Sequence, residues 1–434
     1  MKKLSILTGK AIQKLSRLHG GGSALPGLVI EKTDPSFLGQ VLSSLPLGVA
    51  VVSGTNGKTT TTKIVTELLE KQGLRVFTNK TGSNFIRGVL SAVLEEIKPD
   101  GTFDYDIAVL ELDEAHAVHF AETIPINYAL ILNVQRDQLD RFCELDHTAA
   151  LLEKTTLAAE KAAVLNREDP LVRNLRTSNA VYYGLSKELR KLFPSDDDLL
   201  SGEASSYDNL PAVDRLPADV VLYSLQDHHA IYRMEDLEYS CDLSLDGIYN
   251  AFNAAGALAL CRQILKDMTM VSTPGSPDQT PARTGAADPE ALIRDLSSVR
   301  SAFGRSEEIR YKETSVQLIL VKNPAAFQLS LASFLNDDCS YMIVINDHDA
   351  DGRDMSWLWN VDFSALPGVH TLSGTRAPEM ALRLKYDQVP FEHVEEDLSR
   401  ALDIFLPSPG HKRIFATYTA MLELRKLLTG RSLI

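Results

Sequence analysis

The residues with the clearest chemical potential form one glycine-containing loop, Gly54-Thr55-Asn56-Gly57-Lys58-Thr59. Glycines let backbone N–H groups turn toward a phosphate, and the start of a following helix adds a favourable dipole. Lys58 can reach the β- and γ-phosphates of a nucleotide, and the Thr59 hydroxyl can ligate Mg²⁺. The match to G-x-x-x-x-G-K-[ST] is incomplete, because Val52 occupies the first-glycine position. A chance glycine turn is the alternative, but strand, loop, Lys-Thr pair and helix coincide here, so we predict a nucleotide site.

A buried strand and an amphipathic helix must position this loop. Residues 49–53 (VAVVS) are apolar and β-branched, as expected for a parallel strand that is buried on both faces. Residues 59–72 carry four apolar residues on one helical face, and Gly73 stands where a C-cap glycine is expected. Further strand candidates before residue 170 lie at 107–110, 128–132 and 163–165. Strands that alternate with helices predict an α/β fold with a parallel central sheet.

A second, smaller α/β pattern begins near Ser301, with strands expected near 318–321 and 342–345. Before it, an acidic excursion at 193–219 and a Pro/Gly/Thr-rich stretch at 272–289 are predicted to be flexible insertions. We therefore predict three parts: an N-terminal helical segment packed on the core (1–46), a central nucleotide-binding domain (47–300) and a C-terminal α/β domain (301–434).

Composition excludes several classes of protein. The chain has 434 residues, with 58 acidic and 44 basic ones and a formal charge of -14. This balance argues against a nucleic-acid binder that neutralises phosphates over a broad surface. The four cysteines form no C-x-x-C pair, so no zinc knuckle or disulfide framework is expected, and a reducing cytoplasm is the simplest setting. No apolar run approaches the roughly 18 residues of a membrane span, so none is predicted.

The N-terminal stretch, residues 1–19, is basic and has the spacing of an amphipathic helix. Its basic residues are spread along the segment and its apolar runs are short, so it lacks the apolar region of a signal peptide. Two interpretations stay open. The helix packs on the first domain, or it makes a weak peripheral contact with an anionic surface at the inner face of the membrane.

The run S-G-T-N-G-K-T-T-T at 53–61 resembles the phosphate loop of the Mur ligases, the ATP-dependent amide-forming enzymes of peptidoglycan synthesis, and of their folylpolyglutamate synthase relatives. The resemblance continues at L-E-L-D-E (110–114), a strand end where the family places a magnesium-binding glutamate. Glu111 is the first candidate for that role and Glu114 the second. A solvated acidic loop is the alternative, but a Mg²⁺–ATP site needs hard oxygen ligands.

Two more elements match the nucleotide side of this family, and one position departs from the pattern of its amino-acid-adding members. In G-I-Y-N-A-F-N-A-A (247–255), the resemblance implies that Asn250 and Asn253 bond adenine, although an Asn cap on a plain helix also explains them. Arg305 matches a phosphate-contacting arginine, whose charge would stabilise a transferring phosphoryl group. Amino-acid-adding Mur ligases have a metal-site histidine where this chain has Gln138, which argues against amino-acid addition.

The C-terminal third resembles one branch only, the MurT family. The resemblance includes residues 346–357, and the most specific run in it is D-G-R-D-M-S-W at 351–357. MurT proteins are the synthetase subunits of lipid II isoglutaminyl synthase and form a heterodimer with GatD, a class I glutaminase. The resemblance implies that ATP phosphorylates the D-glutamate α-carboxylate of the lipid II stem peptide, and that ammonia converts this acyl phosphate to D-isoglutamine. ATP and Mg²⁺ are the implied cofactors.

The same resemblance gives Asp354 a role in the partner's active site, where it would orient the histidine of the Cys-His pair. The alternative is that the clustered aspartates form a turn or a loose cation site. None of the chain's cysteines lies on the glycine-flanked elbow of a class I glutaminase, so a partner must supply ammonia. Many relatives carry a four-cysteine zinc ribbon, but the acidic excursion here has no cysteine, and we expect no structural zinc.

Two other functions stay open. One is an amino-acid ligase of the Mur or folylpolyglutamate type. The other is a nucleotide-dependent scaffold for a glutaminase that performs no chemistry of its own.

Overall fold

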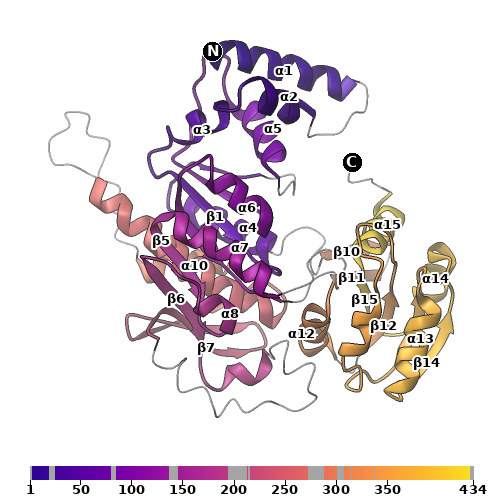
Figure 1. The fold of residues 1–434 in the computed structure, drawn as a ribbon. Helices are drawn as coiled ribbons and strands as arrows, with labels where there is room; N and C mark the ends of the chain where they lie inside the picture. Colours follow the sequence, from indigo (N-terminus) through magenta and orange to yellow (C-terminus); the bar gives the residue numbers. More distant parts are fainter. Residues whose placement is uncertain are drawn as a thin grey trace.

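A computed structural model describes residues 2–18, 25–79, 85–135, 145–193, 213, 216–271, 288–300, 307–312, 314–336 and 338–430. Several features predicted from the sequence lie outside these residues. They are Gln138, Cys143, Arg305 and most of the two insertions, 193–219 and 272–289. Figure 1 shows two sheet-centred parts side by side, with a layer of N-terminal helices at one end of the larger part.

The larger sheet of the described chain has nine strands in the order β2-β3-β1-β4-β5-β6-β7-β8-β9. It is parallel from β2 to β7 and antiparallel from β7 to β9. The bounds are β1 (Val49–Ser53), β2 (Val76–Phe77), β3 (Ile107–Glu111), β4 (Ile126–Ile131), β5 (Ala159–Asn166), β6 (Ala180–Leu185), β7 (Ala218–Gln226), β8 (His229–Met234) and β9 (Leu237–Asp242). The predicted strands and parallel sheet of this part are confirmed.

Helices cover both faces of this sheet, which explains why β1 is apolar throughout. Ala50 and Val52 pack with α4 and α10, whereas Val49 and Val51 pack in a second core with the N-terminal helices. Successive strand residues point to opposite faces, so a strand covered on both sides needs apolar residues at every position. The helices around this sheet are α4 (Lys58–Lys71), α5 (Ile86–Glu96), α6 (Glu114–Ala121), α7 (Leu145–Ala158), α8 (Pro170–Arg173), η1 (Leu189–Leu192), α10 (Ile248–Val271) and α11 (Pro289–Leu296).

Three helices precede the first strand: α1 (Lys2–Leu18), α2 (Leu25–Thr33) and α3 (Phe37–Leu42). In Figure 1, α1 forms the outermost layer over α2 and α5. Its inner face is buried through Ile6, and a Cβ added at Gly9 would lie 2.6 Å from Leu94 Cδ2. Its outer face leaves Leu4 and Leu7 73% and 59% exposed. None of the described helices combines the length and apolar character that a membrane span requires.

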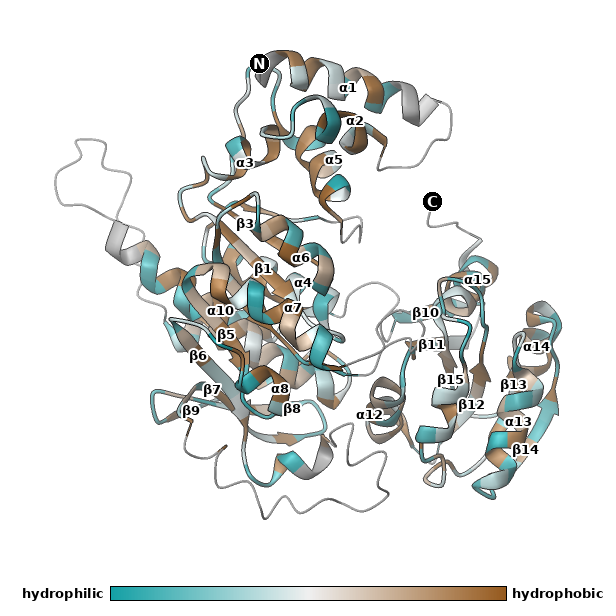
Figure 2. Ribbon diagram, viewed as in Figure 1, coloured by the Kyte–Doolittle hydropathy of each residue, from teal (hydrophilic) through white to brown (hydrophobic). Residues whose placement is uncertain are grey.

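The smaller sheet has six strands in the order β10-β11-β15-β12-β13-β14, parallel except for the β10–β11 pair. Its strands are β10 (Glu307–Tyr311), β11 (Thr314–Leu320), β12 (Cys339–Val344), β13 (Val369–Ser373), β14 (Phe391–Val394) and β15 (His411–Ala416). Its helices are α12 (Pro324–Phe334), η4 (Ser356–Asn360), α13 (Ala377–Tyr386), α14 (Leu398–Phe405) and α15 (Tyr418–Thr429). Figure 2 shows the hydrophobic residues gathered along the central strands of both sheets.

The parallel register aligns the carboxyl ends of four neighbouring strands. Leu320, Val344 and Ser373 end β11, β12 and β13 level with Ala416 of β15. The loops that follow these strands therefore share one edge, where open α/β sheets bind their ligands. The predicted α/β character of the C-terminal part is confirmed. The exact domain boundaries, 1–46, 47–300 and 301–434, stay predictions.

Candidate active site

The phosphate loop leaves β1 between the carboxyl ends of β3 and β4, its neighbours in the sheet. Gly54 and Gly57 have φ angles of 124° and 89°, which L side chains rarely adopt. A Cβ at Gly54 would lie 2.9 Å from the carbonyl oxygen of Asn133, and one at Gly57 would lie 2.7 Å from Asn253 Oδ1. Both positions therefore require glycine, for the backbone conformation and for the lack of room for a side chain. The loop leads into the N-terminus of α4, and a helix N-terminus is a favourable place for an anion.

The substitution Gly57→Ala tests this close packing. We expect nucleotide affinity to fall at least about tenfold, because the new methyl group displaces either the Asn253 amide or the loop. Gly430→Ala is the matched control, since Gly430 also has a positive φ, of 66°, but nothing lies within 4 Å of its added Cβ. Each substitution costs about 1–2 kcal/mol of backbone strain. Nucleotide titrations that give the same affinity for both variants would contradict the packing role.

Lys58 begins α4 and turns back over the loop. Its ammonium nitrogen lies 2.7 Å from the carbonyl oxygen of Gly54 and 3.2 Å from Asp113 Oδ1. Lys58 is only 8% exposed, so its charge lies in a largely dehydrated position beside the phosphate loop. Asp113 is the N-cap residue of α6. The acidic strand end after β3 therefore supplies a counter-ion for the lysine, a role that the sequence did not reveal.

The side chains of Thr59 and Glu111 bring two hard oxygen atoms, a hydroxyl and a carboxylate oxygen, close together. Thr59 Oγ1 donates to Glu111 Oε1 over 2.8 Å, and Glu111 is 5% exposed. The Asn79 side chain fixes the Glu111 backbone in both directions, accepting from its N–H at 3.0 Å and donating to its carbonyl at 2.8 Å. A hydroxyl and a carboxylate beside a phosphate cradle fit Mg²⁺, which takes few protein ligands together with substrate phosphates. Glu114, the second candidate, is buried in the first turn of α6.

Substituting Glu111→Gln tests the proposed magnesium ligand. The change removes the charge and keeps the side-chain shape, and the bonds from Asn79 go to the main chain, so the fold is expected to survive. We expect the Mg²⁺ concentration for half-maximal activity to rise about tenfold or more. Glu114→Gln is the matched control, with an unchanged requirement for Mg²⁺. A larger effect from Glu114→Gln than from Glu111→Gln would overturn the assignment.

Side chains that follow β4 hold the rest of the loop. Thr55 N donates to the Asn133 carbonyl at 3.0 Å, and Asn56 N donates to Asn133 Oδ1 at 2.8 Å. The Asn56 side chain donates to Gln135 Oε1 at 2.6 Å. The loop is therefore shaped before any ligand arrives, which lowers the conformational cost of binding phosphate.

The C-terminal sheet touches this loop directly. Lys322, just after β11, donates to the Thr55 carbonyl at 3.0 Å. The amides of Asn56 and Asn323 bond one another in both directions, at 3.3 and 3.2 Å. Asn323 also caps α12 by accepting from Ala326 N at 2.9 Å. The carboxyl edge of the smaller sheet thus closes on the phosphate loop of the larger one.

The two asparagines of α10 have different surroundings. The Asn253 amide lies against Gly57, as the added Cβ shows. Asn250 is fully buried and donates to the Asp246 carbonyl at 2.6 Å, while none of the described residues bonds to its Oδ1. Asn253 therefore belongs to the phosphate-loop region, and Asn250 carries a buried acceptor with bonding capacity. An adenine contact for the pair stays a prediction, as does the phosphate contact of Arg305.

Asp354 lies on the loop between β12 and η4, at the carboxyl edge of the smaller sheet. It is exposed, and its Oδ1 accepts from Ser356 N at 2.9 Å. This backbone hydrogen bond lowers the pKa of the Asp354 carboxyl, so the group is charged at neutral pH. The carboxylate is thus oriented by its own loop and open to a partner.

Neighbouring aspartates anchor that loop through separate partners. Asp351 is 6% exposed and accepts from the N–H of Thr419 at 2.8 Å and from its hydroxyl. Asp347 accepts from Arg376 Nε at 2.8 Å and from the Thr375 hydroxyl at 2.8 Å. Since these carboxylates bond to different elements, the geometry favours a structured turn over a shared cation site.

Two family sequence patterns match the chain. The Mur ligase middle domain matches residues 52–261, and the MurT ligase C-terminal domain matches residues 320–421. A MurT subunit of lipid II isoglutaminyl synthase (glutamine-hydrolyzing) from Streptococcus pneumoniae is 30% identical over 99% of this chain and 98% of its own. The chain belongs to the MurT family. The MurT subunit from Staphylococcus aureus strain COL is 27% identical over 96% of this chain and 95% of its own.

Solved structures show that this MurT-family chain has the Mur ligase fold. The MurF ligase of Thermotoga maritima in complex with ADP has a TM-score of 0.62 and 18% identity, over 94% of this chain and 85% of that one. The folylpolyglutamate synthase of Mycobacterium tuberculosis, complexed with ADP and AMPPCP, has a TM-score of 0.57 and 16% identity, over 90% and 93%. The family and fold predicted from the sequence are confirmed.

Two of the three cysteines that the structure describes in this MurT-family chain, Cys241 and Cys261, are poor nucleophiles. Burial raises the pKa of Cys241 to about 12 and also raises the pKa of the fully buried Cys261. A thiol with such a pKa has almost no thiolate at neutral pH, and the thiolate is the reactive form. Cys339 is partly buried, and Cys143 lies outside the described residues.

Proposed function

We propose that this chain is an ATP-dependent carbon–nitrogen ligase that amidates the α-carboxylate of D-glutamate in the lipid II stem peptide, giving D-isoglutamine during peptidoglycan synthesis. The observation that carries the proposal is the phosphate loop with its Lys58, Thr59 and Glu111 side chains, closed by the edge of a MurT-type C-terminal sheet. The related chains from Streptococcus pneumoniae and Staphylococcus aureus are named as subunits of lipid II isoglutaminyl synthase.

A carboxylate resists ammonia until one of its oxygens becomes a good leaving group. In the first step, a carboxylate oxygen bonds to the γ-phosphorus of ATP while the bond between that phosphorus and ADP breaks. In the second step, ammonia attacks the acyl carbon, inorganic phosphate leaves and the nitrogen loses a proton. Lys58 and the loop amides hold the phosphates and offset their charge. Thr59 and Glu111 would hold Mg²⁺, which would supply positive charge against the charge that develops on the transferring phosphoryl group.

Ammonia is proposed to come from a partner, a GatD-like class I glutaminase in a heterodimer. The printed name of the Streptococcus pneumoniae relative, a glutamine-hydrolyzing synthase subunit, supports this division of labour. The raised pKa values of Cys241 and Cys261 support it as well. Asp354 is exposed and charged, which suits the orientation of a partner histidine through its ring N–H.

We propose that the reaction takes place in the cytoplasm, where ATP is available, at the inner face of the membrane that would hold the lipid-linked substrate. Helix α1 supports a weak peripheral contact there. It contains no acidic residue and presents Leu4 and Leu7 to solvent, 73% and 59% exposed. A basic amphipathic face with exposed leucines is attracted to anionic lipid.

A reconstitution tests the proposed function. The full chain, given ATP, Mg²⁺, lipid II and ammonium, is expected to release ADP and phosphate in step with an amidated product. Glutamine is expected to replace ammonium only when a partner glutaminase is added. Phosphate release with glutamate or another amino acid as the nitrogen donor would favour an amino-acid ligase. Nucleotide binding without product under every condition would favour a non-catalytic scaffold.

A further inference from the structure

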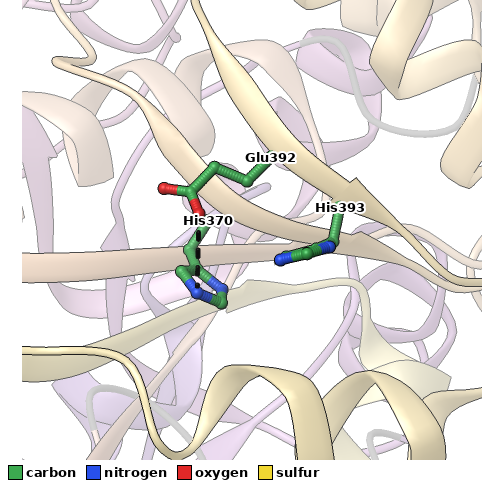
Figure 3. Close-up of side chains that lie close together, drawn as sticks. All are labelled: His370, Glu392 and His393. Atoms are coloured by element: carbon green, nitrogen blue, oxygen red, sulfur yellow. Dashed lines mark ion pairs between the residues drawn. The ribbon is translucent and has the colours of Figure 1, made fainter.

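A cluster of potential metal ligands lies on β13 and β14 of the smaller sheet. It is separate from the contacts that the segment after β11 makes with the phosphate loop. His370 is on β13, and Glu392 and His393 are adjacent residues of β14, the edge strand. Figure 3 shows the three side chains gathered together, with the His393 ring extending toward His370. The parallel register places Glu392 level with His370, because the flanking pairs are Val369 with Phe391 and Thr371 with His393.

The distances within the cluster suit a transition-metal ion. One nitrogen from each imidazole and one Glu392 oxygen all lie within 4.8 Å of one another, and His370 Nε2 is 3.8 Å from Glu392 Oε2. Zn²⁺ binds imidazole nitrogen and carboxylate oxygen at about 2.0–2.2 Å, which puts tetrahedral ligands about 3.4 Å apart. The side chains of Glu392 and His393 are exposed, so changes of rotamer can bring their ligand atoms to the separation that a bound ion requires.

A neighbouring hydroxyl orients the inner ligand. His370 Nδ1 lies 2.8 Å from Oγ1 of Thr371, a fully buried residue, and the ring packs on Phe405 with centroids 5.9 Å apart. When Nδ1–H donates to this hydroxyl, the lone pair of Nε2 faces Glu392. Metal-binding histidines are held in this way, by a bond from the other ring nitrogen. The nearby Lys412 is turned away, donating to the carbonyls of Pro409 and Gly410 at 3.2 and 2.8 Å.

We propose that His370, Glu392 and His393 form a binding site for one divalent transition-metal ion, with Zn²⁺ as the best match to two imidazoles and a carboxylate. The fourth position is open to water. The ion would tie β14 to β13 and so stabilise the edge of the sheet. This site uses no cysteine and is therefore different from the zinc ribbon that the sequence lacks. It does not depend on the proposed amidation.

Zinc titration of the purified full chain in excess Mg²⁺ tests the site. We expect one Zn²⁺ per chain and a higher melting temperature with the ion bound, because a ligand that binds only the native state stabilises it. His393→Ala and Glu392→Gln are each expected to weaken binding at least tenfold. Thr371→Val removes the orienting hydroxyl and is expected to weaken it by about 10–100-fold.

The matched control is His229→Gln. His229 Nδ1 lies 2.8 Å from Asp242 Oδ1 on β8 and β9, so it offers a similar exposed histidine–carboxylate pair, but the residues that the structure describes add no third ligand to it. This variant is expected to bind zinc like the unmodified chain. Zinc affinity that is unchanged in both His393→Ala and Glu392→Gln, or equally reduced in His229→Gln, would overturn the proposal.

Discussion

Replacing Lys58 by methionine is expected to lower kcat for amidation by about 10³-fold, with ammonium and with glutamine alike. Methionine approaches the length of lysine but carries no charge. The Lys58 ammonium lies 2.7 Å from the Gly54 carbonyl, so it is already aimed at the loop that would hold the phosphates. Steady-state measurement of ADP release and amide formation checks this loss. Both are expected to fall together, since charge stabilisation is lost in the first chemical step.

Folding is not expected to fail in this variant. The side chain of Asp113, the counter-ion of Lys58, is 37% exposed and can be solvated by water when the ammonium is gone. Lys63→Met is the matched control on the same helix, where Lys63 pairs with Glu67 at 3.6 Å on a half-exposed surface. We expect that control to keep wild-type activity. A Lys58→Met enzyme that retains a tenth of the activity would exclude phosphate stabilisation by Lys58.

The second large effect is expected from Asp354→Asn, and it depends on the nitrogen source. Glutamine-dependent amidation is expected to fall by about 10³–10⁴-fold, the loss seen when the carboxylate of a catalytic triad becomes an amide. Ammonium-dependent amidation is expected to stay at the wild-type rate. Asparagine can still accept from Ser356 N through its Oδ1, so the loop keeps its shape. Paired assays of the heterodimer with the two nitrogen donors measure the difference.

Asp349→Asn provides the control for this loop. Asp349 is also exposed, but its carboxylate pairs with Arg353 of its own loop at 2.8 Å. We expect this variant to use both nitrogen donors normally. Equal loss of the two activities in Asp354→Asn would mean that the residue supports the synthetase itself, and the partner-facing role would be wrong.

The sequence predicted those parts of the site that are contiguous in the chain. Strand, glycine loop, Lys58, Thr59 and helix follow one another directly, so their local chemistry was enough to predict the phosphate loop. Glu111 was predicted from the resemblance to the Mur ligases, because that family places a magnesium-binding glutamate at the end of the matching strand. Asp354 came from the same source, through the run of residues around it.

The remaining contacts join residues that are far apart in the sequence. Asn323 meets Asn56 across 267 positions, and nothing in either segment specifies the angle at which the two sheets meet. Asn79 was missed because its partner is the main chain of Glu111, which leaves no pattern of residue types. The histidine cluster was missed for another reason, since His370 and His393 become neighbours only through the parallel register of β13 and β14.

The central claim is that ATP activates the D-glutamate α-carboxylate as an acyl phosphate in a site built around Lys58. The most direct measurement uses lipid II whose α-carboxylate carries a heavy-oxygen label, with ATP, Mg²⁺ and ammonium. Because the leaving phosphate keeps the carboxylate oxygen to which it was transferred, we expect one labelled oxygen in the released inorganic phosphate for each amide formed. Amide formation with unlabelled phosphate, or with AMP and pyrophosphate as the nucleotide products, would contradict the account.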